Sequence, residues 1–152
     1  MHDFHLVERS EFDYWEYRNF YNHPDAVRIH DDLLRYIGDS LKWIPCHFPR
    51  RRGELIECSG LNQIGFTVIK EEGASIAHRV FGLWADLFSY GPEVLKLTGN
   101  WTWVDGEPME SGEFSTIIEH RENLVSSLKK IAEYAKEVSE SQGRLYVLHM
   151  GI

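Results

Sequence analysis

Histidines are the residues of this chain best suited to acid–base or metal chemistry, and the chain contains eight of them. Their local pairings with carboxylates are His30 with Asp31 and Asp32, His78 with Asp86, and His120 with Glu119. None of these pairings has the His-Glu-x-x-His spacing that places two imidazoles and a base on one helical face. We therefore expect no metal site and no cofactor, and histidines that are exposed or hydrogen-bonded within the fold.

Nucleophilic and phosphate-binding motifs are also absent from the sequence. Ser59 precedes Gly60, but the surrounding Glu-Cys-Ser-Gly-Leu differs from the Gly-x-Ser-x-Gly turn of serine hydrolases. No Gly-x-Gly-x-x-Gly or Gly-x-x-x-x-Gly-Lys-Ser/Thr occurs. Cys46 and Cys58 do not form a close metal-ligand pair, so we expect reduced thiols rather than a disulfide in a reducing compartment. The sequence thus predicts no catalytic residues.

Binding is better supported, by two tryptophans beside an acidic segment. Trp101 and Trp103 are two residues apart, which puts them on one face if this segment is a strand. They either pack against a helix as core or form an exposed aromatic platform of the kind that dominates interface energetics. The expected partner-binding set is Trp101, Trp103, Asp105, Glu107, Glu110 and Glu113.

The charge balance points in the same direction. The chain has 16 basic and 24 acidic side chains and a formal charge of −8, which opposes nucleic-acid binding by bulk electrostatics. Residues 105–140 hold nine acids and four bases, which leaves −5 of that charge in one region. A run of three arginines, Arg50–Arg52, is expected to be a solvated loop.

The elements that would position this acidic segment have clear patterns. Residues 94–104 and 113–120 are rich in β-branched and aromatic residues, and turn formers separate them, so a β-hairpin with a long acidic loop is expected. Apolar residues recur with helical spacing between 122 and 142, and Gly143 marks the end of that helix. Residues 144–150 are almost continuously apolar, which predicts a central, buried strand.

Upstream, the pattern predicts N-terminal helices that include 12–20 and 24–38, a connector over 45–53, strands over 54–58 and 63–70, and a helix over 75–88. The expected fold is a single domain spanning 1–152, of the α+β or α/β class. It would have a mixed sheet of about five strands packed with three or four helices. If the last strand joins the predicted hairpin, the crossover helix makes one strand pair parallel.

These features favour a small acidic binding protein, most concretely a bacterial immunity protein that neutralises a cognate toxin such as a nuclease. The reason is that such toxins need basic clefts, which an acidic inhibitor complements. The expected partner is a basic protein, and we expect no nucleic acid or membrane partner. No stretch reaches the roughly twenty apolar residues of a membrane span, so a cytoplasmic location is expected. The alternative is a small cytosolic enzyme, a hydrolase or transferase, with a site assembled from dispersed residues such as Cys58, His78 and His120.

Overall fold

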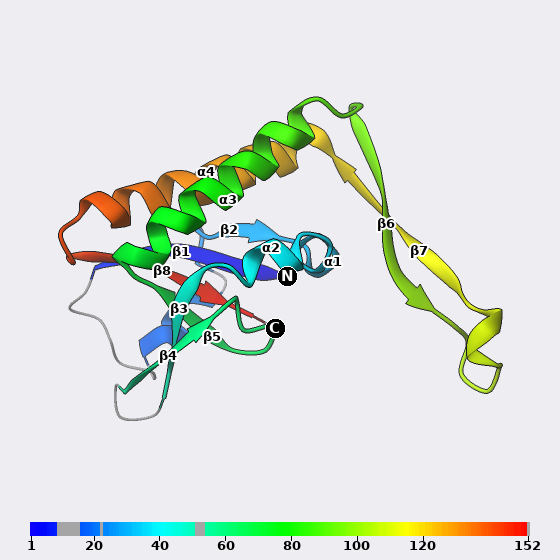
Figure 1. The fold of residues 1–152 in the computed structure, drawn as a ribbon, viewed down its shortest axis with the longest axis horizontal. Helices are drawn as coiled ribbons and strands as arrows, with labels where there is room; N and C mark the ends of the chain where they lie inside the picture. Colours follow the sequence, from blue (N-terminus) through cyan, green and yellow to red (C-terminus); the bar gives the residue numbers. More distant parts are fainter. Residues whose placement is uncertain (9–15, 22, 51–53, 152) are drawn as a thin grey trace.

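A six-stranded sheet forms the centre of the fold (Figure 1). The computed structural model describes residues 1–8, 16–21, 23–50 and 54–151. The strands lie in the order β2-β1-β8-β5-β3-β4. Their bounds are β1 His2–Glu8, β2 Val27–Ile29, β3 Pro45–Pro49, β4 Leu55–Ser59, β5 Phe66–Ile69 and β8 Leu145–Met150. Within this sheet, every pairing between described strands is antiparallel.

The last strand, β8, lies in the interior of this sheet between β1 and β5. Residues 146–150 are all buried, which confirms the central position that their apolar run predicts. The turn that leads into β8 is made by Gln142 and Gly143, which both have positive φ angles of 55° and 78°. Glycine adopts this left-handed conformation without steric cost, so the helix before it ends here and the chain enters the sheet.

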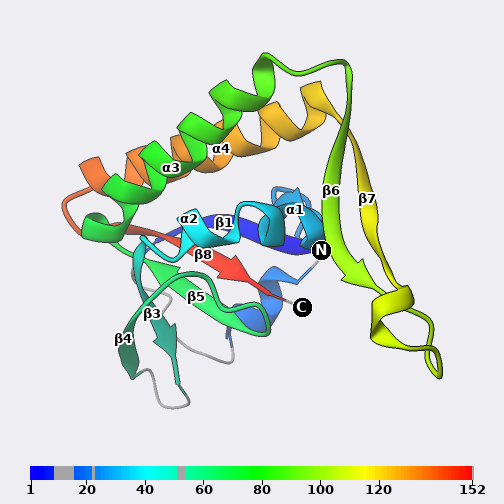
Figure 2. The same ribbon diagram turned by 45° about the vertical axis from the view of Figure 1, so that its right-hand side comes forward.

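Two long helices, α3 (Glu71–Ser89) and α4 (Arg121–Glu140), pack side by side over one face of the sheet (Figures 1 and 2). Alanines let the helices approach closely because their side chains add little bulk: Ala77 and Ala85 on α3 and Ala135 on α4 are fully buried. Gly73 brings the start of α3 against β3, since a β-carbon there would overlap the carbonyl of Pro45. Two short helices, α1 (Asp31–Tyr36) and α2 (Gly38–Leu41), complete this layer.

A smaller apolar cluster forms on the other face of the sheet. Its centre is Tyr17, which is fully buried and packs edge-on against the ring of Phe66 at 5.4 Å between centroids. Tyr17 belongs to the 3-10 helix η2 (Glu16–Phe20). The other buried members are Val7, Val68, Tyr146, Leu148 and Met150. Both faces of the central strands are therefore covered, which explains why β5 and β8 are largely apolar, with Thr67 and His149 as buried polar exceptions.

The α+β class is confirmed, with a six-stranded antiparallel sheet, a separate hairpin and four α-helices in the described residues. The expected mixed sheet with a parallel pair is wrong. Two helices, α3 and α4, lie between β5 and β8 in the chain. The chain runs along the sheet once in each helix, in opposite directions, so β8 enters the sheet antiparallel to β5. The hairpin predicted over 94–120 forms its own sheet, which β8 does not join.

Two other predictions about the first third of the chain are wrong. Residues 27–29, predicted to be helical, form the edge strand β2, and residues 45–49, predicted to be a connector, form β3. Of the helix predicted over 12–20, residues 12–15 lie outside the described residues, as do Arg51 and Arg52. In the described parts of the chain, no helix is long and apolar enough to cross a membrane.

Candidate partner-binding arm

The hairpin of β6 (Val94–Thr102) and β7 (Glu113–His120) leaves the body between the end of α3 and the start of α4 (Figures 1 and 2). We call residues 94–120 the arm. Its strands pair from Val94 opposite His120 to Thr102 opposite Glu113. This is the hairpin that the sequence predicts, with its long loop at the far end.

The base of the arm is fixed to the body. Leu95 and Ile117, from opposite strands, are buried in the main core together with residues of α3 and α4. The backbone N–H of Arg121 donates to Glu93 O at 2.9 Å, and its guanidinium Nη1 donates to Gly91 O at 2.8 Å. These contacts tie the two ends of the arm together, so its direction is set by the helix pair.

The distal half of the arm is organised around Trp101. The pairing register shifts between Thr98 and Trp101, which is a β-bulge or similar irregularity. Beyond it, the Trp101 ring packs edge-on against Phe114 at 5.0 Å between centroids. The indole Nε1 donates to Met109 O at 3.0 Å and so holds the loop. Gly112 permits this arrangement, since a β-carbon there would lie 2.7 Å from Trp101 Nε1 and 2.5 Å from Thr102 O.

The loop at the tip is also hydrogen-bonded. Glu107 N–H donates to Val104 O at 3.0 Å, and Gly106, with a φ of 94°, occupies the left-handed position of this turn. A short 3-10 helix, η3, follows over Met109–Ser111. A loop with internal hydrogen bonds presents its side chains in a defined arrangement, which lowers the entropic cost of binding.

Apolar side chains are unusually exposed at this tip. Trp101 is 39% and Trp103 is 47% exposed, so the alternative in which both are core residues is wrong. Trp103 lies one residue past the end of β6, and Trp101 has a structural as well as a surface role. The other exposed large apolar residues here are Val104, Met109 and Phe114. Apolar patches that protrude into solvent commonly mark interaction sites.

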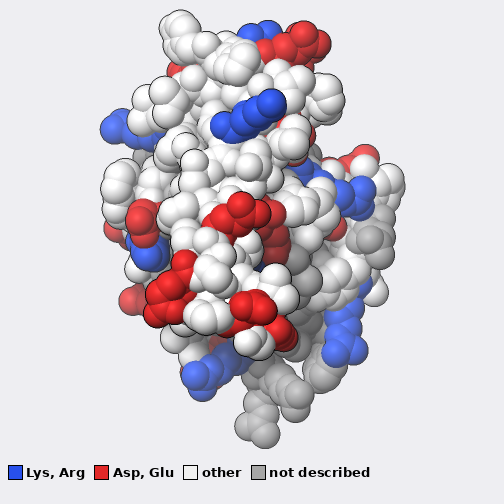
Figure 3. All heavy atoms as spheres, turned by 90° about the vertical axis from the view of Figure 1, so that its right-hand side faces the viewer, with Lys and Arg blue, Asp and Glu red and all other residues white. Residues whose placement is uncertain are grey.

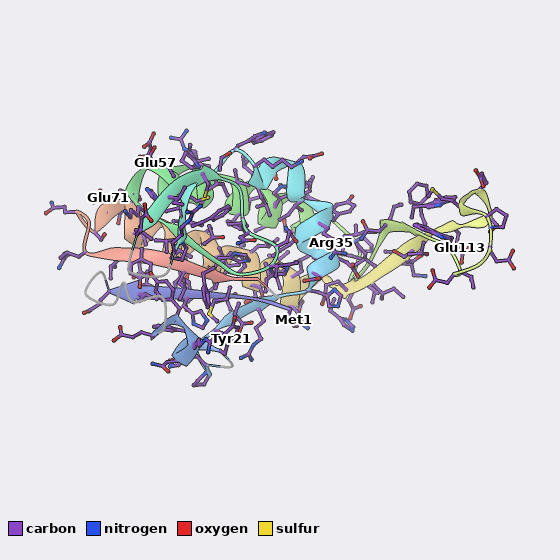
Figure 4. The ribbon with its side chains drawn as sticks, turned by 90° about the horizontal axis from the view of Figure 1, so that it is seen from below. Met1, Tyr21, Arg35, Glu57, Glu71 and Glu113 are labelled. Atoms are coloured by element: carbon purple, nitrogen blue, oxygen red, sulfur yellow. The ribbon has the colours of Figure 1, made fainter. Side chains whose placement is uncertain are left out.

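The same tip is negatively charged. Asp105, Glu107, Glu110 and Glu113 are all exposed, and no lysine or arginine lies between Lys96 and Arg121. Figure 3 views the molecule from the side of the arm and shows carboxylates gathered in the middle of this face. Figure 4 shows Glu113 on the arm, well beyond Met1 and Arg35 of the body. The structure therefore brings together all six residues of the predicted binding set at one end of the molecule.

The chain matches no protein-family model, no curated protein and no solved structure.

The residues suggested for an enzymatic site lie on different elements. Cys58 is on β4, His78 is on α3 and His120 ends β7. The His78 ring hydrogen-bonds across the α3–α4 contact, where its Nδ1 lies 3.0 Å from Ala132 O. Within the described residues, no group of three or more His, Cys, Asp or Glu side chains is placed to hold a metal ion.

A chain of polar side chains, which sequence reasoning missed, runs through the core. His2 Nε2 lies 2.7 Å from Asp31 Oδ1, and His2 Nδ1 is hydrogen-bonded to His149 Nε2 at 2.9 Å. His149 Nδ1 in turn lies 3.3 Å from the hydroxyl of Thr67. The Asp31 carboxyl group lies against His2 Nε2 and favours a proton on that nitrogen, so His149 Nε2 donates to His2 Nδ1, and Thr67 donates to His149 Nδ1.

The imidazoles of His2 and His149 in this polar chain are held neutral. His2 and His149 are fully buried, and burial lowers the pKa of each below its ordinary value. A third buried histidine, His5, lies on β1 with its ring 5.3 Å from that of Phe20, and burial lowers its pKa to about 4. All three histidines are parts of the core. His2 and His149 are hydrogen-bonded to one another, as expected of buried histidines, whereas the buried Nε2 of His5 has no hydrogen-bond partner among the described residues.

Proposed function

We propose that this protein is a small acidic binding protein that occludes a basic protein partner with its arm. In its most concrete form, it is a bacterial immunity protein of the cytoplasm that neutralises a cognate toxin, such as a nuclease. The observation that supports this function is the composition of the arm tip, where exposed carboxylates and exposed aromatic side chains occur together without a basic residue.

The two kinds of side chain have different roles in this proposal. The four carboxylates raise the rate of encounter with a positively charged surface, an effect that extends over about 8 Å at physiological ionic strength. Trp103, Met109 and Phe114 then supply apolar area, and tryptophan in particular is enriched among residues that dominate binding energy. An arm that projects from the body can enter a concave site that a flat surface cannot reach.

A nuclease is the partner class that fits this chemistry best. Its active cleft must be basic to hold phosphates. Carboxylates on a narrow hairpin can take the place of phosphates in such a cleft, and the accompanying aromatic side chains can occupy the space of bases. Binding of this kind blocks the substrate without any reaction, so the inhibitor needs no catalytic group.

The enzymatic alternative has less support in the described residues. Two hollows of about 420 Å³ fall within the range of about 300–1,000 Å³ that is usual for small-molecule sites. One is lined by Lys42, Ser59, Gln63 and neighbouring residues, and the other by Glu122, Lys129, Glu133 and neighbouring residues. The residues suggested for an enzymatic site, Cys58, His78 and His120, line neither of them.

The test is capture of the partner from the native cell, with two variants that carry equal charge. The arm variant replaces the four tip acids by amides: Asp105→Asn, Glu107→Gln, Glu110→Gln and Glu113→Gln. The control replaces four exposed acids of the body: Glu54→Gln, Glu57→Gln, Asp86→Asn and Glu137→Gln. Each variant has a formal charge of −4, from −8 with four acids removed.

We expect the wild type and the control to retain one basic protein that cleaves nucleic acid, and to inhibit that cleavage. The arm variant should associate with it at least about tenfold more slowly at low salt, because steering accounts for much of the association rate. Equal association by the arm variant and the control would refute the role of the arm. A captured partner that is acidic, or that lacks nuclease activity, would refute the nuclease form of the proposal.

A further inference from the structure

We propose that Cys46 and Cys58 are a reversible disulfide site, which is oxidised by exchange with a small-molecule disulfide. The two cysteines lie on β3 and β4, and this site is separate from the arm. The cysteine pair lies at one edge of the six-stranded sheet, because β4 is the outermost strand next to β3 (Figure 1).

The pairing of the strands places the two residues in a geometry that a disulfide can accept. Cys46 and Cys58 are direct partners in the antiparallel register. Direct antiparallel partners have Cα atoms about 4.5 or 5.5 Å apart, and disulfides span about 4.4–6.8 Å between Cα atoms. Either kind of pair is therefore compatible with a bond, and the backbone does not have to move.

The sulfur atoms are already in contact. Cys46 Sγ lies 2.9 Å from Cys58 Sγ, so both side chains point to the same side of the hairpin and toward one another. Cys46 Sγ also lies 2.9 Å from Gly60 O, which holds its side chain in this orientation. A disulfide bond is about 2.05 Å long, so it forms after a movement of about 1 Å by the two sulfurs.

The order of the reaction follows from exposure. Cys46 is 2% exposed, whereas Cys58 is only partly buried, on the edge strand. The Cys58 thiolate attacks one sulfur of the external disulfide, whose S–S bond breaks, and one thiolate leaves. The Cys46 thiolate then attacks the Cys58 sulfur and expels the second thiolate. The protein loses two protons and two electrons, and the external disulfide is reduced to two thiols.

The second step decides which product accumulates. It joins groups that are already in contact, so it is intramolecular and fast relative to any further external attack. The first step is slow, because burial raises the pKa of the Cys58 thiol and leaves little thiolate at neutral pH. Burial raises the pKa of the Cys46 thiol as well, but its contact with the Cys58 sulfur offsets this in the second step. The pair therefore stays reduced in a strongly reducing compartment, as the sequence leads us to expect, and becomes oxidised on prolonged exposure to disulfides.

The experiment uses the full chain, incubated with oxidised glutathione and then with dithiothreitol. We expect the mass to fall by two hydrogens, both cysteines to become resistant to alkylation, and dithiothreitol to reverse both changes. The cross-link closes a short loop, since the cysteines are twelve positions apart. Its constraint on the unfolded chain should raise the Tm by about 6–11 °C.

Two single variants separate the proposed pairing from general thiol reactivity. Cys46→Ser should accumulate a stable glutathione adduct at Cys58, because no second thiol is present to displace it. Cys58→Ser should react far more slowly, because only the buried Cys46 remains. A lasting glutathione adduct on the wild type, a disulfide-linked dimer, or no loss of alkylatable thiol would each overturn the proposal.

Discussion

The buried histidine His5 predicts a specific loss of stability in mild acid. Burial lowers its pKa from 6.5 to about 4, so the native state excludes a proton that the unfolded state accepts. Above pH 6.5 both states are neutral at this position and it contributes no pH dependence. As the pH falls from 6.5 to about 4, the unfolded state gains the proton first and native stability is lost.

The size of the effect follows from the two pKa values. One pKa unit corresponds to about 1.4 kcal/mol, so the full loss at His5 is about 3 kcal/mol, reached below pH 4. Between pH 7 and pH 5, the loss is about 2 kcal/mol. Small proteins have unfolding free energies of about 5–15 kcal/mol, so this one side chain accounts for a measurable share. His2 and His149 act in the same direction, because burial lowers the pKa of both.

The substitution that isolates this contribution is His5→Gln, which keeps a polar side chain but does not titrate. Urea unfolding, followed by tryptophan fluorescence at pH 7 and pH 5, gives the loss for each protein. We expect the wild type to lose about 2 kcal/mol more than His5→Gln over this interval. A control variant, His120→Gln, changes an exposed histidine and should match the wild type. Equal losses in the wild type and His5→Gln, or an NMR titration of His5 near 6.5, would refute this reasoning.

Two further substitutions test the core and the arm. His149→Leu removes the side chain between His2 and Thr67 and leaves their buried polar atoms without a partner. We therefore expect the free energy of unfolding, measured with urea at pH 7, to fall by about 2 kcal/mol or more. A fall of less than about 0.5 kcal/mol is the size expected at an exposed site and would contradict the proposed polar chain. Gly112→Ala places a β-carbon against Trp101 and Thr102, so hydrogen exchange should increase at the arm tip while the amides of β8 keep their protection. Gly82→Ala, whose added β-carbon meets nothing within 4 Å, is the control, and unchanged exchange at the tip of Gly112→Ala would show that this contact does not order the loop.

Elements with long, local patterns were predictable from the sequence, and those defined by distant partners were not. The arm, α4 and β8 were predicted to within a few residues, because alternation, helical spacing and Gly143 are all local signals. The strand β2 has only three residues and owes its conformation to pairing with β1, which no local pattern reveals. The strand β3 was missed because it contains Pro45 and Pro49. Proline is unfavourable inside strands, but these two prolines stand at the two ends of β3.

The candidate site could be predicted as a set of residues, but not as a surface. Spacing placed Trp101 and Trp103 together, but whether another element covers them depends on where the helix pair directs the arm. The polar chain in the core was beyond sequence reasoning for a related reason. His2 and His149 are separated by 147 positions, and β1 and β8 become neighbours only in the finished sheet.

The arm is inserted between α3 and α4, and only its base takes part in the main core. If the arm binds the partner as proposed, folding and recognition are encoded in different stretches of the chain. Changes in residues 103–111 would then alter the binding surface, while the sheet and the helix pair keep their contacts. New specificities could then arise by substitution or exchange of one short loop, on a scaffold that keeps its core.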